Sequence, residues 1–187
     1  MLPRLDARFS AKYPEVALDI RMADTDVTIA SLLEREVEVA VVGCTVEHPK
    51  LVGRVIEEEE LVPVVAAADS IGEGSVTAED LAGIPFVMRE EGSATRRAVE
   101  AGLREAGIGA RVAMELGSNI AVAGAVAEGA GIGVIPSRFV ASQPSVRPLS
   151  VRGLSIRSPF VLVVERGRAL SPAAEAFVQM CIERNDL

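Results

Sequence analysis

Residues 90–97 combine hydroxyl side chains with two adjacent positive charges where a helix is predicted to begin. The segment reads Glu-Glu-Gly-Ser-Ala-Thr-Arg-Arg, with hydroxyls at Ser93 and Thr95 and cations at Arg96 and Arg97. The free N–H groups of a first helical turn already carry partial positive charge, so arginines there are unfavourable unless an anion lies nearby. A bound anion would remove this conflict. Alternatively, the two glutamates and solvent screen the arginines, and Ser93 is an ordinary N-cap.

Small, hydrogen-bonding residues recur at other junctions where a predicted strand ends and a helix begins. In open α/β sheets, ligands bind beyond the carboxyl ends of the strands, where helix N-termini converge. The candidate ligand-binding residues are therefore Thr25, Gly43, Cys44, Thr45, Ser93, Thr95, Ser118, Asn119 and Ser137. The alternative for Thr25 and Ser118 is that they are plain N-caps, and Cys44 is alternatively a small buried apolar side chain.

The sequence contains no recognised catalytic or metal-binding motif. The single histidine, His48, has no nucleophile in a known arrangement with it, and Cys44 and Cys181 lack metal-ligand spacing. The glycine-rich run 129–133 is similar to a dinucleotide fingerprint, but it follows a predicted helix and precedes a strand, the reverse of the required order. We therefore expect a binding protein with no catalytic residue, no metal and no cofactor.

Composition and charge narrow the class of protein further. The 187 residues are 49% hydrophobic but only 3% aromatic, so the core is built from Val, Ala, Leu and Ile, as in mixed α/β proteins. The net charge of −8 repels phosphate backbones, and we expect no nucleic-acid binding by this chain alone. Two separated cysteines, no signal-peptide pattern and no apolar run of membrane-spanning length predict a cytoplasmic protein without a membrane partner.

Hydrophobic periodicity predicts alternating strands and helices along most of the chain. Strands are predicted at 16–22, 37–43, 51–56, 61–67, 85–89, 110–116, 131–135, 146–151 and 160–164, and helices at 2–13, 25–33, 77–81, 94–106, 119–128 and 172–184. The acidic block Glu57–Glu60 is interpreted as a solvated turn or an exposed strand edge. The fold class that follows is α/β, with two Rossmann-like lobes.

The chain passes between these two predicted lobes twice. Residues 1–64 and 141–187 are expected to form the first lobe, and residues 65–140 the second. Two connecting passages act as a hinge on which a ligand cleft between the lobes can open and close. Together the lobes would make one effector-binding domain.

Several segments resemble the effector-binding domain of LysR-type transcriptional regulators. The likeness is carried by residues 2–14, by 32–43 with the run Val-Glu-Val-Ala-Val-Val-Gly, by 85–96 and by 115–136. It extends over essentially the whole chain. The resemblance implies a fold similar to type 2 periplasmic binding proteins and a small anionic metabolite or oxyanion bound between the lobes.

The resemblance also implies roles for individual residues and partners. By position, Ser93 and Thr95 would contribute hydroxyls and Ser118 a helix-start contact, while Thr25 and residues 43–45 would line the other lobe. Members of the family bind DNA through a separate N-terminal winged helix-turn-helix, which this chain lacks. They form homo-oligomers, and the implied assembly is a dimer of this domain and a tetramer of the full-length protein.

The chain departs from the family pattern in two places. Family domains commonly begin with a strand that ends in a Ser- or Thr-containing turn, and this chain begins after it, so a strand of the first lobe is expected to be missing. Glu36 stands where glycine is common. A ligand-sensing regulatory domain is the favoured hypothesis, and the alternatives are a stand-alone solute-binding protein or a small enzyme with a carboxylate-based site.

Overall fold

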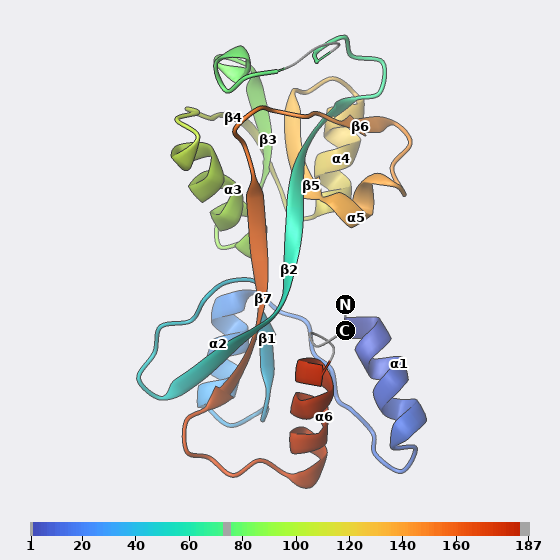
Figure 1. Ribbon diagram of the computed structural model, residues 1–187, viewed down its shortest axis with the longest axis vertical. Coiled ribbons are helices and arrows are strands. Elements are labelled where there is room, and N and C mark those ends of the chain that lie inside the picture. The colour runs from blue at the N-terminus through green and yellow to red at the C-terminus, as the bar shows by residue number, and fades with distance from the viewer. Residues whose placement is uncertain (1, 73–75, 184–187) are drawn as a thin grey trace. The chain divides into compact units, whose positions relative to one another are not determined.

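The computed structural model describes residues 2–72 and 76–183 of the chain (Figure 1). Its elements follow the order α1 (Leu2–Lys12), α2 (Thr25–Leu33), β1 (Ala40–Val42), β2 (Leu51–Ala66), the 3-10 helix η1 (Glu79–Leu81), β3 (Pro85–Arg89), α3 (Ala94–Glu105), β4 (Arg111–Leu116), α4 (Asn119–Ala127), β5 (Ile132–Pro136), α5 (Ser137–Val140), β6 (Val146–Pro148), β7 (Ile156–Glu165) and α6 (Pro172–Glu183). The predicted mixed α/β fold class is confirmed.

The chain divides into two compact units. Unit 1 consists of residues 1–58 and 159–187, and unit 2 of residues 59–158. Strands β2 and β7 each contain one of the boundaries. Residues 141–158 were predicted to lie in the first lobe but belong to unit 2, where β6 pairs with the last residues of β2.

Unit 1 has helices on both faces of a small sheet. Strand β1 pairs antiparallel with β7, and side chains of β7 point alternately to opposite faces. On one face Val161 and Val163 pack with Leu32 of α2. On the other face Leu162 packs with Phe9 of α1 and with α6. The period-two pattern of β7 thus builds two apolar cores at once.

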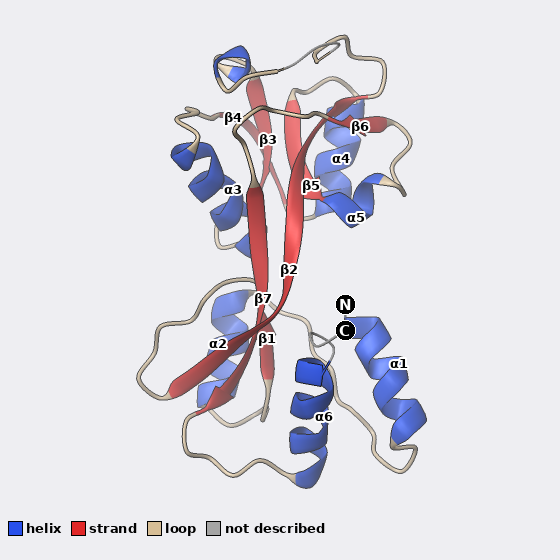
Figure 2. Ribbon diagram, viewed as in Figure 1, coloured by secondary structure: helices blue, strands red, loops and turns tan. Residues whose placement is uncertain are grey.

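Unit 2 is a mixed sheet covered by α3 on one face and by α4 on the other (Figure 2). Its strand order is β2-β5-β3-β4, with β6 also paired to β2. Strands β5, β3 and β4 are parallel to each other, whereas β2 is antiparallel to β5. Phe86 and Met88 pack with α3, and Val87 packs with α4. The parallel part of the sheet is therefore buried on both faces at β3, as is typical of this arrangement.

The strand predicted at residues 16–22 is wrong. The segment contains no strand, and Ile20 and Met22 are exposed. Alternation of apolar and polar residues produces a strand only when a neighbouring strand supplies hydrogen-bond partners. Among the described residues no strand pairs with this segment.

Two other predicted elements differ in extent. The acidic block Glu57–Glu60 lies inside one continuous strand, β2, so its interpretation as a solvated turn is wrong. Charged side chains do not end a strand when they occupy partly exposed positions of an extended backbone. The helix predicted at residues 77–81 is only the three-residue η1, because Asp80 accepts hydrogen bonds from the backbone nitrogen and hydroxyl of Thr77 and closes a short turn.

Candidate ligand-binding site

Three strand-to-helix junctions lie at one edge of the sheet in unit 2. Parallel strands β5, β3 and β4 end there, and each leads into a helix. Two of the junctions are tied together, because the backbone nitrogen of Glu90 donates to the carbonyl oxygen of Leu116 at 3.1 Å. The five candidate residues of unit 2 occur at these junctions: Ser93, Thr95, Ser118, Asn119 and Ser137.

Ser93 is the N-cap residue of α3, yet its side chain makes no capping hydrogen bond. The residue is only 7% exposed. Its backbone nitrogen donates to the carbonyl oxygen of Glu90 at 3.2 Å, and its carbonyl oxygen accepts from the nitrogen of Arg97 at 3.1 Å. The ordinary N-cap role considered for Ser93 is therefore not the role of its hydroxyl. The hydroxyl of a largely buried serine that does not cap its helix is suited to contacting a ligand.

Ser118 does perform the capping role. Its hydroxyl oxygen accepts a hydrogen bond from the backbone nitrogen of Ala121 at 3.1 Å, at the start of α4. The hydroxyl hydrogen remains able to donate. Next to it, the side-chain oxygen of Asn119 is buried and makes no hydrogen bond within the described part of the chain. A donor brought by a ligand would satisfy this oxygen.

The backbone at these helix starts offers further donors. Within residues 2–72 and 76–183, no acceptor is hydrogen-bonded to the backbone nitrogens of Ala94 and Thr95 in α3, or of Asn119 and Ile120 in α4. The first N–H groups of a helix have no partner within the helix, and the helix dipole places partial positive charge there. The same edge of unit 2 thus presents two groups of amide donors.

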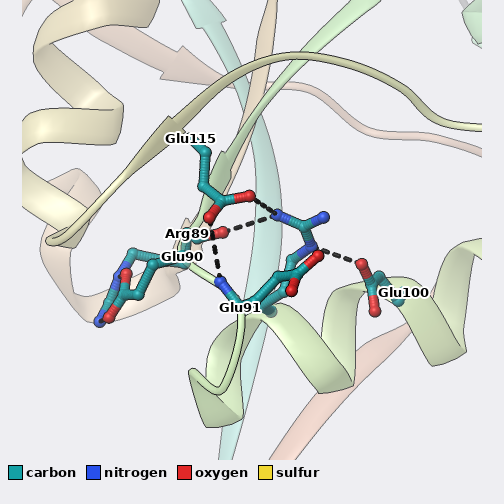
Figure 3. A network of polar contacts seen from close by, with 6 residues as sticks. Arg89, Glu90, Glu91, Glu100 and Glu115 are labelled. Carbon is teal, nitrogen blue, oxygen red and sulfur yellow. Dashed lines mark hydrogen bonds and ion pairs between the residues drawn. The ribbon is translucent and has the colours of Figure 1, made fainter.

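Arg96 is not the unbalanced cation that the sequence suggested. Its side chain is buried against two carboxylates, Glu100 through Nε and Glu115 through Nη1 at 3.2 Å, and Nη1 also donates to the carbonyl oxygen of Arg89 at 2.8 Å (Figure 3). Burial acts to lower the pKa of Arg96, but the hydrogen bonds and charges of Glu100 and Glu115 raise it further than burial lowers it. A bound anion is not needed to neutralise this arginine.

The glutamates expected to screen the arginines have other partners. Glu90 accepts two hydrogen bonds from Arg89, each 2.7 Å long, and this pairing holds the pKa of Glu90 below its usual value. Glu91 contributes its backbone nitrogen, which donates to Glu115 at 3.3 Å. The spacing of Arg96 and Glu100 could have been recognised as an i,i+4 helical pair. The pairing of Arg96 with Glu115 could not have been recognised, because Glu115 lies on strand β4 and not on the same helix.

The other four candidate residues belong to unit 1. Thr25 is the first residue of α2 and is half-buried, and its N-cap neighbour Asp24 makes no side-chain capping bond. Gly43, Cys44 and Thr45 follow β1, with Thr45 exposed and Cys44 a partly buried free thiol. A role of these four residues in ligand binding stays a prediction.

Among residues 2–72 and 76–183, no group of three or more His, Cys, Asp or Glu side chains is arranged to hold a metal ion. No helix in the described ranges is both long enough and apolar enough to cross a membrane.

Comparison with known proteins identifies relatives over most of the chain. Residues 1–186 match the family model for the LysR substrate binding domain. The chain is 31% identical over 183 residues to the HTH-type transcriptional regulator CbbR of Rhodospirillum rubrum. This alignment covers 94% of this chain and 59% of that protein. It is 30% identical over 183 residues to the RuBisCO operon transcriptional regulator of Acidithiobacillus ferrooxidans, with 95% and 59% covered. The chain thus spans about three fifths of the length of these relatives.

Solved structures show the same architecture. The regulatory domain of CcmR from Synechocystis PCC6803, in complex with 2-PG, aligns with a TM-score of 0.86 at 25% identity, covering 97% of this chain and 89% of that one. The effector binding domain of QuiR aligns with a TM-score of 0.88 at 19% identity, covering 100% and 90%, and this likeness shows the fold. From the family match over nearly its full length and this shared fold, the chain belongs to the LysR substrate-binding domain family.

Proposed function

We propose that this chain is the ligand-sensing part of a LysR-type transcription regulator, and that it binds a small anionic effector. The family assignment supports the regulatory role, since the curated relatives are regulators of transcription. DNA would be bound by a winged helix-turn-helix outside this sequence. A regulator of this kind acts where the DNA is, so we infer a cytoplasmic location, and we propose that the chain is not an enzyme.

The observation that carries the proposal is the hydroxyl of the buried residue Ser93, which does not cap its helix, beside the amide groups that begin α3. Ser93 is 7% exposed and does not cap its helix, and the backbone nitrogens of Ala94 and Thr95 have no acceptor within the described residues. A carboxylate, phosphate or sulfate oxygen accepts hydrogen bonds from such groups and is attracted by the helix dipole. The Ser118 hydroxyl hydrogen and the backbone nitrogens of Asn119 and Ile120, at the start of α4, are donors of the same kind.

The charge balance of the site suggests how an anion would be held. Arg96 is neutralised by Glu100 and Glu115, and Arg89 by Glu90. Binding would therefore depend on hydroxyl and amide donors instead of an unpaired cation. For comparison, the structure of the CcmR regulatory domain contains 2-PG, a phosphate-bearing acid, which makes 2-phosphoglycolate a suitable first probe.

The partner proposals follow from the family. We propose a homo-oligomer, with a dimer of this domain and a tetramer of the complete regulator. The roles of Thr25 and of Gly43, Cys44 and Thr45 in unit 1 stay predictions, as does a contact from Ser137. Each can be tested by the same binding measurement.

Isothermal titration calorimetry of the purified chain with 2-phosphoglycolate, shikimate and sulfate tests the proposal. We expect at least one anion to bind, and Ser93→Ala to weaken that binding about tenfold, because a hydrogen bond to a charged group is lost. Ser142→Ala is the matched control, since the Ser142 hydroxyl donates to the carbonyl oxygen of Phe139 away from the helix starts. Equal affinity in wild type and Ser93→Ala would refute the site.

Two further outcomes decide between classes of function. A folded wild-type chain that binds none of the probes contradicts the anionic-effector proposal as stated. Chemical conversion of a bound probe, followed by NMR of the ligand, would instead support the small-enzyme alternative.

A further inference from the structure

We infer that Arg96 and Glu115 are positioning residues, which hold the turn Glu90–Ser93 against β4 and thereby set the place of the Ser93 hydroxyl. The inference rests on the proposed function, because it concerns how the proposed anion contact is kept in register. Neither residue is assigned a contact with the ligand itself.

Three hydrogen bonds hold this turn and the end of β3 that leads into it. Nη1 of Arg96 donates to the carbonyl oxygen of Arg89, the last residue of β3, at 2.8 Å. Oε1 of Glu115 accepts from the backbone nitrogen of Glu91 at 3.3 Å, and the nitrogen of Glu90 donates to the carbonyl oxygen of Leu116 at 3.1 Å. Because Arg96 and Glu115 are also paired with each other at 3.2 Å, they form a bridge from α3 to β4 that includes the turn (Figure 3).

The turn is closed by one hydrogen bond of its own, from the nitrogen of Ser93 to the carbonyl oxygen of Glu90 at 3.2 Å. Glu91 and Gly92 are exposed, and Gly92 has a φ of +87°, with no atom within 4 Å of the position a Cβ would take. Positive φ is the conformation for which glycine has no steric penalty, but glycine is also the residue with the most freedom to leave it. Apolar packing therefore does not fix the turn at Gly92. Hydrogen bonds hold the turn in place instead.

Arg96 is unusually well placed to act through the turn. It is 8% exposed, and a buried arginine is stable only when its donors are satisfied. Its three acceptors belong to three different elements: Glu100 to α3, Glu115 to β4 and the Arg89 carbonyl to β3. A change at Glu115 would leave a donor of this buried group unsatisfied and move the chain around it.

Glu100 provides a control that pairs with Arg96, as Glu115 does, but does not contact the turn. Both carboxylates pair with Arg96, and their side chains are 43% and 45% exposed, respectively. Glu100 lies one turn further along α3 and has no hydrogen bond to the turn, whereas Glu115 accepts from Glu91. Replacing either glutamate by glutamine removes one negative charge beside Arg96, but only the Glu115 substitution also alters a contact with the turn.

The experiment compares Glu115→Gln with Glu100→Gln by two measurements on the whole chain. The first is amide hydrogen exchange of Glu91 by NMR, with the core residue Val87 as an internal reference. The second is calorimetric affinity for 2-phosphoglycolate and sulfate. We expect Glu115→Gln to speed exchange at Glu91 relative to Val87 and to weaken anion binding, each by about five- to tenfold. We expect Glu100→Gln to change either quantity by less than about twofold.

A purely structural role for the pair would give a different pattern. Both variants would then lose stability together, with exchange at Val87 and Glu91 rising in parallel, and this would overturn the inference. The inference would also be overturned if Glu115→Gln left the exchange rate at Glu91 unchanged. The same holds if exchange at Glu91 became faster while the affinity for the anion stayed the same. Arg96→Lys is the second variant, since one ammonium group cannot replace all three contacts of the guanidinium and is expected to resemble Glu115→Gln.

Failure of the proposed function would be recognised separately. If the folded wild-type chain binds neither anion, the effector proposal fails and the role of the pair in ligand positioning fails with it. The exchange data then still decide whether Arg96 and Glu115 hold the turn. If wild type binds and only the Glu115→Gln pattern is absent, the positioning inference alone is refuted.

Discussion

Glu38 accepts two hydrogen bonds from Ser171, one from the backbone nitrogen at 2.7 Å and one from the hydroxyl at 2.8 Å. The same hydroxyl oxygen accepts from the backbone nitrogen of Ala174 at 3.2 Å, in the first turn of α6. A carboxylate just before β1 is thus joined to the start of the last helix, with both partners in unit 1. These hydrogen bonds, with that from the Ser171 backbone the larger cause, hold the pKa of Glu38 below its ordinary value.

This lowered pKa predicts an acid-sensitive contribution to the stability of unit 1. Because the folded-state pKa is below the unfolded one, the contribution is present above about pH 4.3 and is lost as the pH falls through the folded value. Glu38→Gln should lower the free energy of unfolding by about 1 kcal/mol at neutral pH and by less at about pH 3. Urea denaturation at both pH values measures it.

The control for this pH dependence is Glu47→Gln. Glu47 is exposed in the same unit and makes no hydrogen bond or ion pair within the described residues. We expect its effect to be small at both pH values. Equal effects of the two substitutions, or an effect of Glu38→Gln that grows on acidification, would contradict the assignment.

The two serines at N-cap positions in unit 2 should differ in the effect of substitution by alanine. Ser118→Ala removes the capping bond to Ala121 and should destabilise the protein by about 1 kcal/mol, while Ser118→Asp should recover most of it. Ser93→Ala removes no capping bond and should change stability by less than about 0.5 kcal/mol. Chemical denaturation measures the free energy of unfolding of the three variants. If Ser93→Ala lowered it as much as Ser118→Ala does, Ser93 would be shown to cap α3.

Gly131 and Gly124 provide a test of backbone conformation. Gly131 has a φ of +132°, and an added Cβ would lie 2.1 Å from the carbonyl oxygen of Pro85, so Gly131→Ala should destabilise the protein by more than about 2 kcal/mol. Gly124 lies inside α4 with no atom within 4 Å of an added Cβ. Gly124→Ala should stabilise it by about 0.5–1 kcal/mol. Thermal unfolding of both variants checks the opposite signs, and matching signs would be inconsistent with this backbone.

Two isoleucines of unit 2 differ in burial, one lying in the core and the other at the surface. Ile132 in β5 is fully buried, and Ile132→Ala should cost about 2–5 kcal/mol through lost burial and the cavity left behind. Ile120 in α4 is 64% exposed, and Ile120→Ala should change stability by no more than about 0.5 kcal/mol. The midpoint of urea unfolding reports both. A large effect at Ile120 would mean that its side chain is covered by another surface in solution.

The local sequence predicts most of unit 2 closely. Strands β3 and β4 and helices α3 and α4 begin and end within a residue or two of their predicted bounds. Their boundaries are marked by residues that act locally, such as Gly107, which has a φ of +72° after α3, and the capping Ser118 before α4. Prediction fails at residues 16–22, where a strand depends on a neighbour that local pattern does not supply.

In the candidate site, too, some features follow from the local sequence and others depend on the tertiary structure. Ser93, Ser118 and Asn119 could be selected from sequence, because a junction between a strand and a helix is recognisable from the chain itself. That the Ser118 hydroxyl caps its helix while the Ser93 hydroxyl does not could not be predicted, since both occupy the same kind of position. The answer depends on side-chain orientation within the fold.

The amino-acid sequence alone determined the α/β class, the resemblance to the LysR family and the hydroxyl-rich helix starts, because periodicity, caps and motifs act over a few residues. Only the tertiary structure decided the charge state of the site. It brought Glu115 of β4 to Arg96 of α3. An arginine that was predicted to need either a bound anion or screening by Glu90, Glu91 and solvent is therefore buried and paired with other carboxylates. Electrostatic energy depends on distance in space, and residues 19 positions apart in sequence become neighbours only when the sheet forms.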